Sequence, residues 1–280
     1  MQATDTIKSV LTSAKKQLNA IESANTDCEV LLSSLLQCTR EHLYSYPEQQ
    51  LTPDLVCDFI SLTRKRSKKF PVSYLTGIKE FWSTDYLVNS STLIPRPETE
   101  LLVEKVLDLI DKDNPVEILD LGTGCGTIAI TLAKERPNTR ITAVDISPEA
   151  VAITRENAQR NKIENICLLV SDWYSEIGNK TFDIIVSNPP YVESDDKGFT
   201  EGEIRFEPRI ALDGGPVGMD ALNIIIPTAA RYLNPHGCLL VEHGYKQGLQ
   251  VRELFKQYHY LNIRTESDYS GHERFTYGDN

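Results

Sequence analysis

The sequence lacks the features of a membrane, secreted or metal-dependent protein. It has no run of about 18 apolar residues, so no transmembrane helix is expected. Its first residues, MQATDTIKSV, lack the charged-then-apolar pattern of a secretory signal. The six cysteines form no C-x-x-C pair and have no histidine cluster nearby, so we expect neither a disulfide framework nor a metal site. These absences together predict a cytoplasmic protein.

Positive charge is also in short supply. The chain carries 29 Lys and Arg against 40 Asp and Glu, which gives a formal net charge of −11. A protein that holds duplex DNA by its phosphates usually has the opposite sign. One basic cluster lies within residues 64–69 and could contact RNA or an acidic partner. A solvated helix end that complements the helix dipole is the simpler interpretation, and we expect no direct nucleic-acid binding.

The first quarter of the chain has a helical pattern. Apolar residues recur at three- and four-residue steps over residues 7–21, as on one face of an amphipathic helix. A second helix is expected behind Asp27, a plausible cap. A third is expected over residues 53–69, because Pro53 suits a first turn. We therefore predict a helical domain over residues 1–75, and since it has no catalytic motif we expect it to recognise a protein substrate.

After residue 75 the apolar residues no longer follow the helical period. Residues 79–94 alternate around a turn at residues 89–91, which predicts a β-hairpin linker over 76–95. A helix is expected to open within PRPETE. Short apolar runs then alternate with helical stretches: VEILDL, RITAVD, ICLLVSD, FDIIVSN and CLLVEHG, with two closing strands in the tail. Such alternation predicts an α/β domain over residues 96–280, with a largely parallel sheet and helices on both faces.

Polar residues follow the first two strands, where open α/β sheets bind their ligands. The first strand runs into the turn Asp120-Leu121-Gly122-Thr123-Gly124-Cys125-Gly126. The glycines allow tight turns and close approach of a ligand. A dinucleotide fingerprint would need glycine where Thr127 stands. The second strand ends at Asp145, whose carboxylate could accept two hydrogen bonds from ribose hydroxyls.

Asp120 could in turn face the cationic amino group of a methionine moiety. Each carboxylate has a plainer interpretation, since Asp120 could cap the next helix and Asp145 could simply end a strand. At consecutive strand ends, and without the dinucleotide spacing, the two together favour S-adenosylmethionine. Trp173, at the third strand end, could form an aromatic wall for adenine, or could be an ordinary core residue.

The fourth strand ends in Asn188-Pro189-Pro190-Tyr191, the most informative four residues of the chain. The two prolines supply no N–H, so the turn offers mainly acceptors. The Asn188 side-chain oxygen and the Pro189 carbonyl could accept both hydrogens of a planar NH2 group, and Tyr191 could stack on it. Orienting a weakly nucleophilic amide nitrogen toward a sulfonium methyl would favour attack. The alternative is a rigid turn, because Asn-Pro is a common turn former.

With these motifs the chain resembles the release-factor glutamine methyltransferases of the HemK/PrmC type. The resemblance covers nearly the whole chain and is carried by PVSYLTGIKEFW, LIPRPETE, DLGTGCGTIAI, AVDIS, SDW, IVSNPPY, RFEPRIALDGG and LLVEHG. It implies a class I (Rossmann-like) S-adenosylmethionine-dependent methyltransferase sheet with a small N-terminal helical bundle. It also implies that the substrate is the glutamine of the Gly-Gly-Gln motif of peptide chain release factors.

The resemblance assigns roles to individual residues. The cofactor S-adenosyl-L-methionine would be bound by Asp120, Leu121, Gly122, Thr123, Gly124, Asp145, Trp173 and Asn188. The glutamine amide would be held by the catalytic turn Asn188, Pro189, Pro190 and Tyr191. Residues 207–215 could form a lid or a structural crossover loop. His243 could be mistaken for a general base, although a packing role is the simpler interpretation.

Three other functions remain open on the sequence alone. A sister enzyme that methylates glutamine in a large-subunit ribosomal protein would use the same chemistry. An adenine-N6 DNA methyltransferase also clamps a flipped NH2 group in such a motif, but the net charge of −11 argues against it. A silent module that binds only a nucleoside or a dinucleotide would not need the Asn188 turn.

Overall fold

The computed structural model describes residues 5–112 and 114–280, which fall into two compact units. Unit 1 contains the chain up to Ile78 together with residues 200–206. Unit 2 contains residues 79–199 and 207–280. Each unit has its own hydrophobic core, and the helices of the described residues do not meet the length and apolarity of a bilayer-spanning segment.

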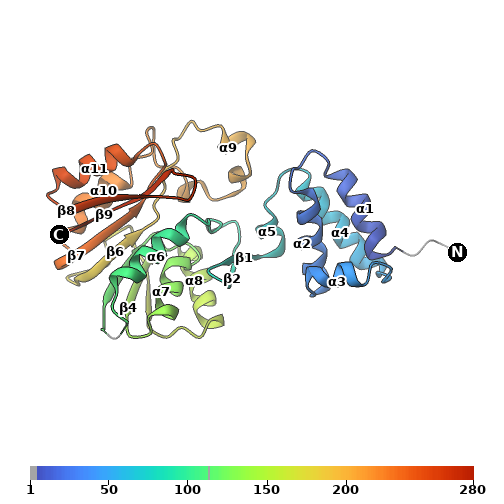
Figure 1. Ribbon diagram of the computed structural model, residues 1–280, viewed down its shortest axis with the longest axis horizontal. Helices are drawn as coiled ribbons and strands as arrows, with labels where there is room; N and C mark the ends of the chain where they lie inside the picture. Colours follow the sequence, from blue (N-terminus) through green and yellow to red (C-terminus); the bar gives the residue numbers. More distant parts are fainter. Residues whose placement is uncertain (1–4, 113) are drawn as a thin grey trace. The chain divides into compact units, whose positions relative to one another are not determined.

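Unit 1 is helical (Figure 1). Its helices are α1 (Ile7–Gln17), α2 (Ala24–Leu36), α3 (Arg40–Ser45), α4 (Pro53–Arg66) and α5 (Val72–Thr76). Thr52 caps α4 by accepting from the Leu55 N–H, and Pro53 occupies the first turn as expected. The expected second helix begins before Asp27, not after it. Asp27 lies inside α2, where it accepts from the Arg66 guanidinium instead of capping the helix.

Unit 2 contains a seven-stranded sheet in the order β5-β4-β3-β6-β7-β9-β8, parallel except for β9. The strands are β3 (Glu117–Leu121), β4 (Arg140–Asp145), β5 (Ile166–Val170), β6 (Phe182–Ser187), β7 (Leu233–Glu242), β8 (Leu261–Ser267) and β9 (Glu273–Asp279). The helices are α6 (Thr99–Leu109), α7 (Thr127–Glu135), α8 (Pro148–Arg160), α10 (Leu222–Ala229) and α11 (Gly248–Gln257), and the short helix α9 (Gly198–Glu201) includes the 199/200 boundary between the units. The mainly parallel α/β architecture expected from the sequence is confirmed.

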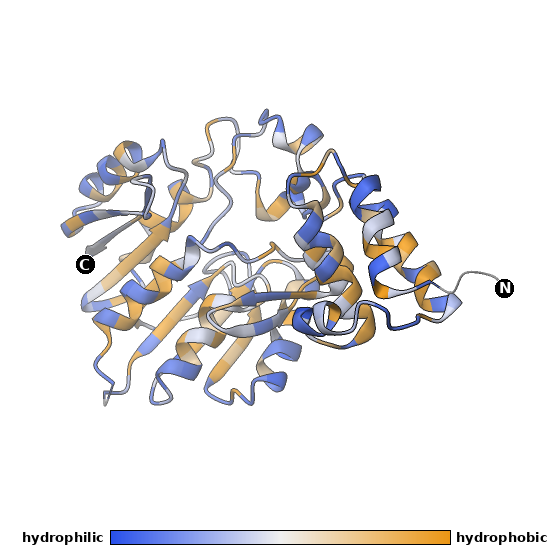
Figure 2. Cartoon of the chain, turned by 45° about the vertical axis from the view of Figure 1, so that its right-hand side comes forward, coloured by the Kyte–Doolittle hydropathy of each residue, from blue (hydrophilic) through white to orange (hydrophobic). Residues whose placement is uncertain are grey.

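The sheet is covered on both faces because its strands are apolar on both faces. Ile118 of β3 packs into a core with α6, α7 and α8, and its neighbour Leu119 packs into a second core with α10 and α11. This alternation follows the two-residue period of a strand. Figure 2 shows the resulting concentration of hydrophobic residues along the strands. Because β3, β4, β5 and β6 pair in parallel, their carboxyl ends lie at the same edge of the sheet.

A two-stranded sheet of β1 (Ile78–Phe81) and β2 (Thr84–Leu87) precedes α6. A hairpin was expected in this region, but its turn is formed by Trp82 and Ser83, both with positive φ, at 51° and 53°. A two-residue hairpin turn of this kind usually contains Asn or Gly. Trp and Ser do not indicate such a turn, so it was not predicted from the sequence. Asn89 forms a separate turn, in which its carbonyl accepts from the Thr92 N–H at 3.1 Å.

Candidate functional site

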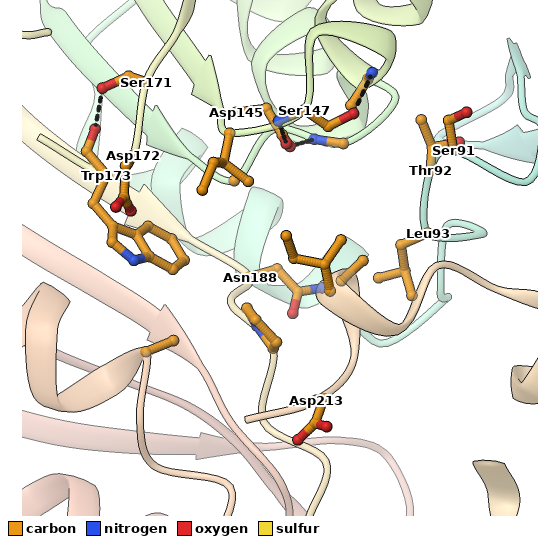
Figure 3. A pocket seen from close by; sticks show the side chains of 18 of the residues that line it. Ser91, Thr92, Leu93, Asp145, Ser147, Ser171, Asp172, Trp173, Asn188 and Asp213 are labelled. Carbon is orange, nitrogen blue, oxygen red and sulfur yellow. Dashed lines mark hydrogen bonds between the residues drawn. The ribbon is translucent and has the colours of Figure 1, made fainter. Parts of the chain in front are cut away.

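A pocket opens at the carboxyl ends of β3, β4, β5 and β6 in unit 2 (Figure 3). Its wall contains five of the residues that the sequence placed in the cofactor site, namely Gly122, Gly124, Asp145, Trp173 and Asn188. They come from four different strand ends, so the parallel sheet is what brings them together. Leu121 lies in the core below, and Asp120 and Thr123 are buried beside the turn.

The turn after β3 is built on left-handed backbone. Gly122 and Gly124 have φ of +72° and +60°, which favours glycine at both positions. The Gly122 and Thr123 N–H groups both donate to the Val144 carbonyl at 2.9 Å, which ties the turn to β4. A Cβ on Gly122 would lie 3.6 Å from the Trp173 ring. The indole therefore stands next to the glycine turn, as a wall for a flat ligand would.

Asp145 holds the turn from the end of β4. One of its carboxylate oxygens accepts from the Gly124 N–H at 2.9 Å, and the other accepts from the Ser147 N–H at 3.0 Å. Burial raises the pKa of Asp145 above its usual range. Because each carboxylate oxygen has a further lone pair, the side chain can hold the backbone and still accept two hydroxyl hydrogens from a ligand.

Asp120 is fully buried behind the turn. Its Oδ2 accepts from the Thr123 hydroxyl at 2.7 Å, while its Oδ1 is buried without a partner among the described residues. Burial, with a smaller contribution from nearby Asp145, raises the pKa of Asp120 to about 7. A buried acceptor without a donor is costly. A carboxylate in this condition suits a cationic or hydrogen-bonding group of a ligand, so the residues fit S-adenosylmethionine.

The turn after β6 is fixed by side chains from two other segments. Asn188 donates through Nδ2 to the Thr99 hydroxyl at 3.0 Å, and Thr99 donates to Glu242 at 2.8 Å. The Tyr191 hydroxyl donates to the other oxygen of Glu242 at 3.0 Å. Asn188 and Pro190 line the pocket. Tyr191 is directed toward Glu242, and its carbonyl accepts from the Gln247 side chain at 3.1 Å. Pro189 is buried in the same turn.

Sequence reasoning missed Thr99 and Glu242. Thr99 lies within PRPETE at the start of α6, and Glu242 ends β7 within LLVEHG. Glu242 is 2% exposed, and burial raises its pKa to about 7. A carboxylate that ends a buried strand at the ligand edge was the available signal. The adjacent His243 is buried, with both ring nitrogens in hydrogen-bond contact with Gly244 and Thr276, as a packing residue would be.

The segment that follows the Asn188–Tyr191 turn also lines the pocket. Ile210, Ala211 and Asp213 line the pocket, and sequence reasoning did not assign them to the site. Just before them, Glu207 is buried, accepts from the Ile94 N–H at 2.9 Å and forms an ion pair with Arg96. This carboxylate thus joins the 207–213 segment to the chain that precedes α6, through residues of unit 2.

Comparison with known proteins gives consistent matches. Family models for the methyltransferase small domain and the PrmC N-terminal domain match residues 97–203 and 9–77. The release factor glutamine methyltransferase of Shewanella oneidensis is 42% identical over 92% of this chain and 90% of its own length. Its counterpart from Escherichia coli is 42% identical over 96% of both chains. A methyltransferase structure from Pyrococcus furiosus shares the fold, with a TM-score of 0.52 and 19% identity over 72% of this chain and 90% of its own.

Proposed function

We propose that this chain, which belongs to the release factor glutamine methyltransferase family, methylates the side-chain amide nitrogen of the glutamine in the Gly-Gly-Gln motif of peptide chain release factors. The methyl donor is S-adenosylmethionine. The observation that carries the proposal is that Asn188 and Pro190 stand in the wall of the same pocket as Gly122, Asp145 and Trp173. In this proposal the donor and acceptor subsites are adjacent.

The donor subsite is assigned by chemistry. The Asp145 carboxylate would accept from the two ribose hydroxyls, and the Trp173 ring beside Gly122 would pack on the adenine. The partnerless Oδ1 of Asp120 would attract the cationic end of the methionine moiety. When bound, S-adenosylmethionine supplies an electrophilic methyl group on a sulfonium. The protein then needs to exclude water and to orient the acceptor.

The acceptor subsite would orient an amide nitrogen. Such a nitrogen is a poor nucleophile because its lone pair is shared with the carbonyl. The Asn188 Oδ1 and the Pro189 carbonyl would accept its two hydrogens, which holds the nitrogen toward the methyl group. Proximity and orientation of this kind can supply several kcal/mol of barrier reduction. Asn188 acts in this scheme through position and hydrogen bonding alone.

Unit 1 would recognise the protein substrate. Residues 9–77 match the PrmC N-terminal domain, while the pocket-lining residues belong to unit 2. We place the reaction in the cytoplasm, which the six free cysteines support because thiols persist in reducing compartments. The ribosomal-protein and DNA alternatives find less support, since the relatives reported above are named for release factors.

Mass spectrometry tests the proposal. Purified release factors, ribosomal proteins and an adenine-containing DNA duplex are each incubated with the enzyme and isotope-labelled S-adenosylmethionine. We expect the mass of one methyl group on the Gly-Gly-Gln glutamine of a release factor. A label found only on a ribosomal protein or on adenine would replace the proposed substrate by that alternative.

A further inference from the structure

A chain of hydrogen bonds lies directly behind the proposed acceptor subsite. It joins three segments that are distant in sequence: the turn after β6, the first residue of α6 and the last residue of β7. Asn188 Nδ2 donates to Thr99 Oγ1 at 3.0 Å, Thr99 Oγ1 donates to Glu242 Oε2 at 2.8 Å, and Tyr191 donates to Glu242 Oε1 at 3.0 Å. Thr99 is 3% exposed and Glu242 is 2% exposed, so bulk water does not compete for these bonds.

The chemical groups in this series of hydrogen bonds determine which group donates and which accepts in each bond. Above its pKa of about 7 Glu242 is ionised and can only accept, so both hydroxyls must then point their hydrogens toward it. The Thr99 hydroxyl has a single hydrogen, which leaves only lone pairs to face Asn188. The Asn188 amide must therefore present its NH2 to Thr99 and keep Oδ1 as a free acceptor. Through two successive hydrogen bonds, Glu242 thus determines which end of the Asn188 side-chain amide faces the ligand.

The orientation matters because the two ends of an amide have opposite hydrogen-bonding roles. With Oδ1 available to the pocket, Asn188 attracts an acceptor NH2 group. If the amide were reversed, the Asn188 NH2 would face the NH2 group of the substrate, and two hydrogen-bond donors would oppose each other. The reversed amide would also place Asn188 Oδ1 against a Thr99 oxygen whose hydrogen is already given to Glu242.

We propose that Thr99 and Glu242 are positioning residues that lock the Asn188 amide with its oxygen toward the acceptor nitrogen. The inference rests on the proposed function, because it concerns the nitrogen acceptor of the same reaction. Neither residue touches the reacting atoms in this scheme. Glu242 acts on the Asn188 amide through Thr99, while its other oxygen holds the Tyr191 hydroxyl.

The test uses full-length enzyme, an intact release factor and single-turnover methyl transfer at about pH 8, above the Glu242 pKa of about 7. Thr99→Val removes the acceptor of the Asn188 NH2 group, and we expect turnover to fall about 10- to 100-fold, less than the ~10²–10³ typical of losing a direct contact. Thr99→Ser keeps the hydroxyl and should restore turnover to within about threefold of wild type. Affinity for S-adenosylmethionine should stay unchanged in both variants.

Glu242→Gln tests the remote end. A glutamine accepts and donates, so the direction of the Thr99 hydrogen is no longer enforced, and we expect turnover to fall about tenfold. In the Thr99→Val background the same substitution should cost nothing further, since a glutamine can still accept from the Tyr191 hydroxyl and its effect on Asn188 passes through Thr99. Thr131→Val is the matched control. Thr131 is also a buried helical threonine, bonded to the Tyr86 hydroxyl at 2.8 Å, and its loss should leave turnover unchanged.

The outcomes separate the inference from the proposed function. Wild-type enzyme that leaves the release factor unmethylated overturns the proposed function, and the inference with it. Wild-type turnover in Thr99→Val, or a Thr99→Ser variant as slow as Thr99→Val, overturns the inference alone. The inference is also overturned if the fold-reduction in turnover of the double variant equals the product of the fold-reductions of the two single variants. Should Glu242→Gln fail to fold, the Val and Ser variants of Thr99 still decide.

Discussion

Buried carboxylates of unit 1 are satisfied in a different way from two buried carboxylates of unit 2, Asp120 and Glu242. In unit 1, Asp27 accepts from the buried Arg66 at 2.6 Å. Glu29, 3% exposed, is bound by Lys15 at 3.2 Å and by Arg40 at 2.6 Å. Burial alone would raise the pKa of Glu29, but hydrogen bonds from Arg40, Tyr44 and Lys15 lower it below its usual value. These carboxylates belong to ion pairs that hold helices together.

In unit 2, Asp120 and Glu242 are bonded by hydroxyls. No cation of the described chain lies within ion-pair distance of either one, and burial raises the pKa of each to about 7. Burying a carboxylate without a cation is costly. Perturbed carboxylates of this kind gather at functional sites, where the cost is tolerated for chemistry. The difference separates carboxylates held in ion pairs from Asp120, which we propose for ligand binding, and Glu242, which we propose for positioning Asn188.

The largest effect should come from breaking an ion pair of unit 1. Arg66→Met leaves Asp27 buried without its cation, and we expect the free energy of unfolding to fall by about 3–5 kcal/mol. Urea titration of the full chain measures it, with Arg64→Met on the exposed side of α4 as the control. Affinity for S-adenosylmethionine should be unchanged. Equal stability of the two variants would mean that the buried pair contributes nothing.

A second substitution addresses the acceptor turn of unit 2. Asn188→Asp keeps size and turn propensity but can only accept, so an oxygen that repels the Thr99 oxygen replaces the NH2 group that donates to it. We expect single-turnover methyl transfer to fall by about 10²–10³, with little change in melting temperature. Wild-type turnover in this variant would reduce Asn188-Pro189-Pro190-Tyr191 to a structural turn.

A smaller effect is expected at the donor subsite. Asp145→Asn keeps one carbonyl acceptor but loses the charge and one acceptor, at about 1.5–3 kcal/mol for a hydrogen bond to a charged group. Calorimetry should show S-adenosylmethionine binding weakened about 10- to 100-fold. Unchanged affinity in a folded variant would remove Asp145 from the site. Tighter binding of NAD than of S-adenosylmethionine by wild type would overturn the proposed cofactor.

The two kinds of carboxylate should also respond oppositely to pH. Glu29 has a lowered pKa, so its ion pairs stabilise the fold above its unfolded pKa, and that stability is lost as the pH falls. Glu242 has a raised pKa, so its charged form costs stability at pH 8, and the cost disappears as the pH falls from about 7 toward 4.5.

Melting temperatures of two matched variants measure this difference. Glu29→Gln should destabilise the protein at pH 8 by about 1–3 kcal/mol. Glu242→Gln should leave its stability equal or higher at the same pH. Near pH 4 the effect of Glu242→Gln should shrink, because wild-type Glu242 is then protonated. If Glu242→Gln destabilised the protein as much as Glu29→Gln, the contrast between the units would fail.

Sequence reasoning located the parts of the site that depend on topology alone. Carboxyl ends of parallel strands meet at one edge, so placing Gly122, Asp145 and Asn188 at strand ends was enough to place them together. The strands themselves were readable because both of their faces are apolar. Apolar periodicity likewise predicted α1, α2 and α4 of unit 1, but not the short helices α3 and α5.

What sequence could not supply depends on side-chain partners across the fold. The bond between Thr99 and Glu242 joins residues that are 143 positions apart in the sequence, and no local pattern encodes it. Asp27 resembles a cap because capping and ion pairing use the same residue type. The Trp82–Ser83 turn has positive φ at residues that rarely adopt it. In each case tertiary contacts override a local preference.

The membership of residues 200–206 in unit 1 has a consequence for protein engineering. The polypeptide passes between the units at 78/79, 199/200 and 206/207, so unit 1 is discontinuous and is not a terminal module. Within it, Glu203 pairs with Arg66 at 2.7 Å, and the Phe206 ring lies 4.9 Å from the ring of Phe70. A chimera that exchanged only the first 78 residues between relatives would separate these partners. Domain grafts in this family should exchange both segments together.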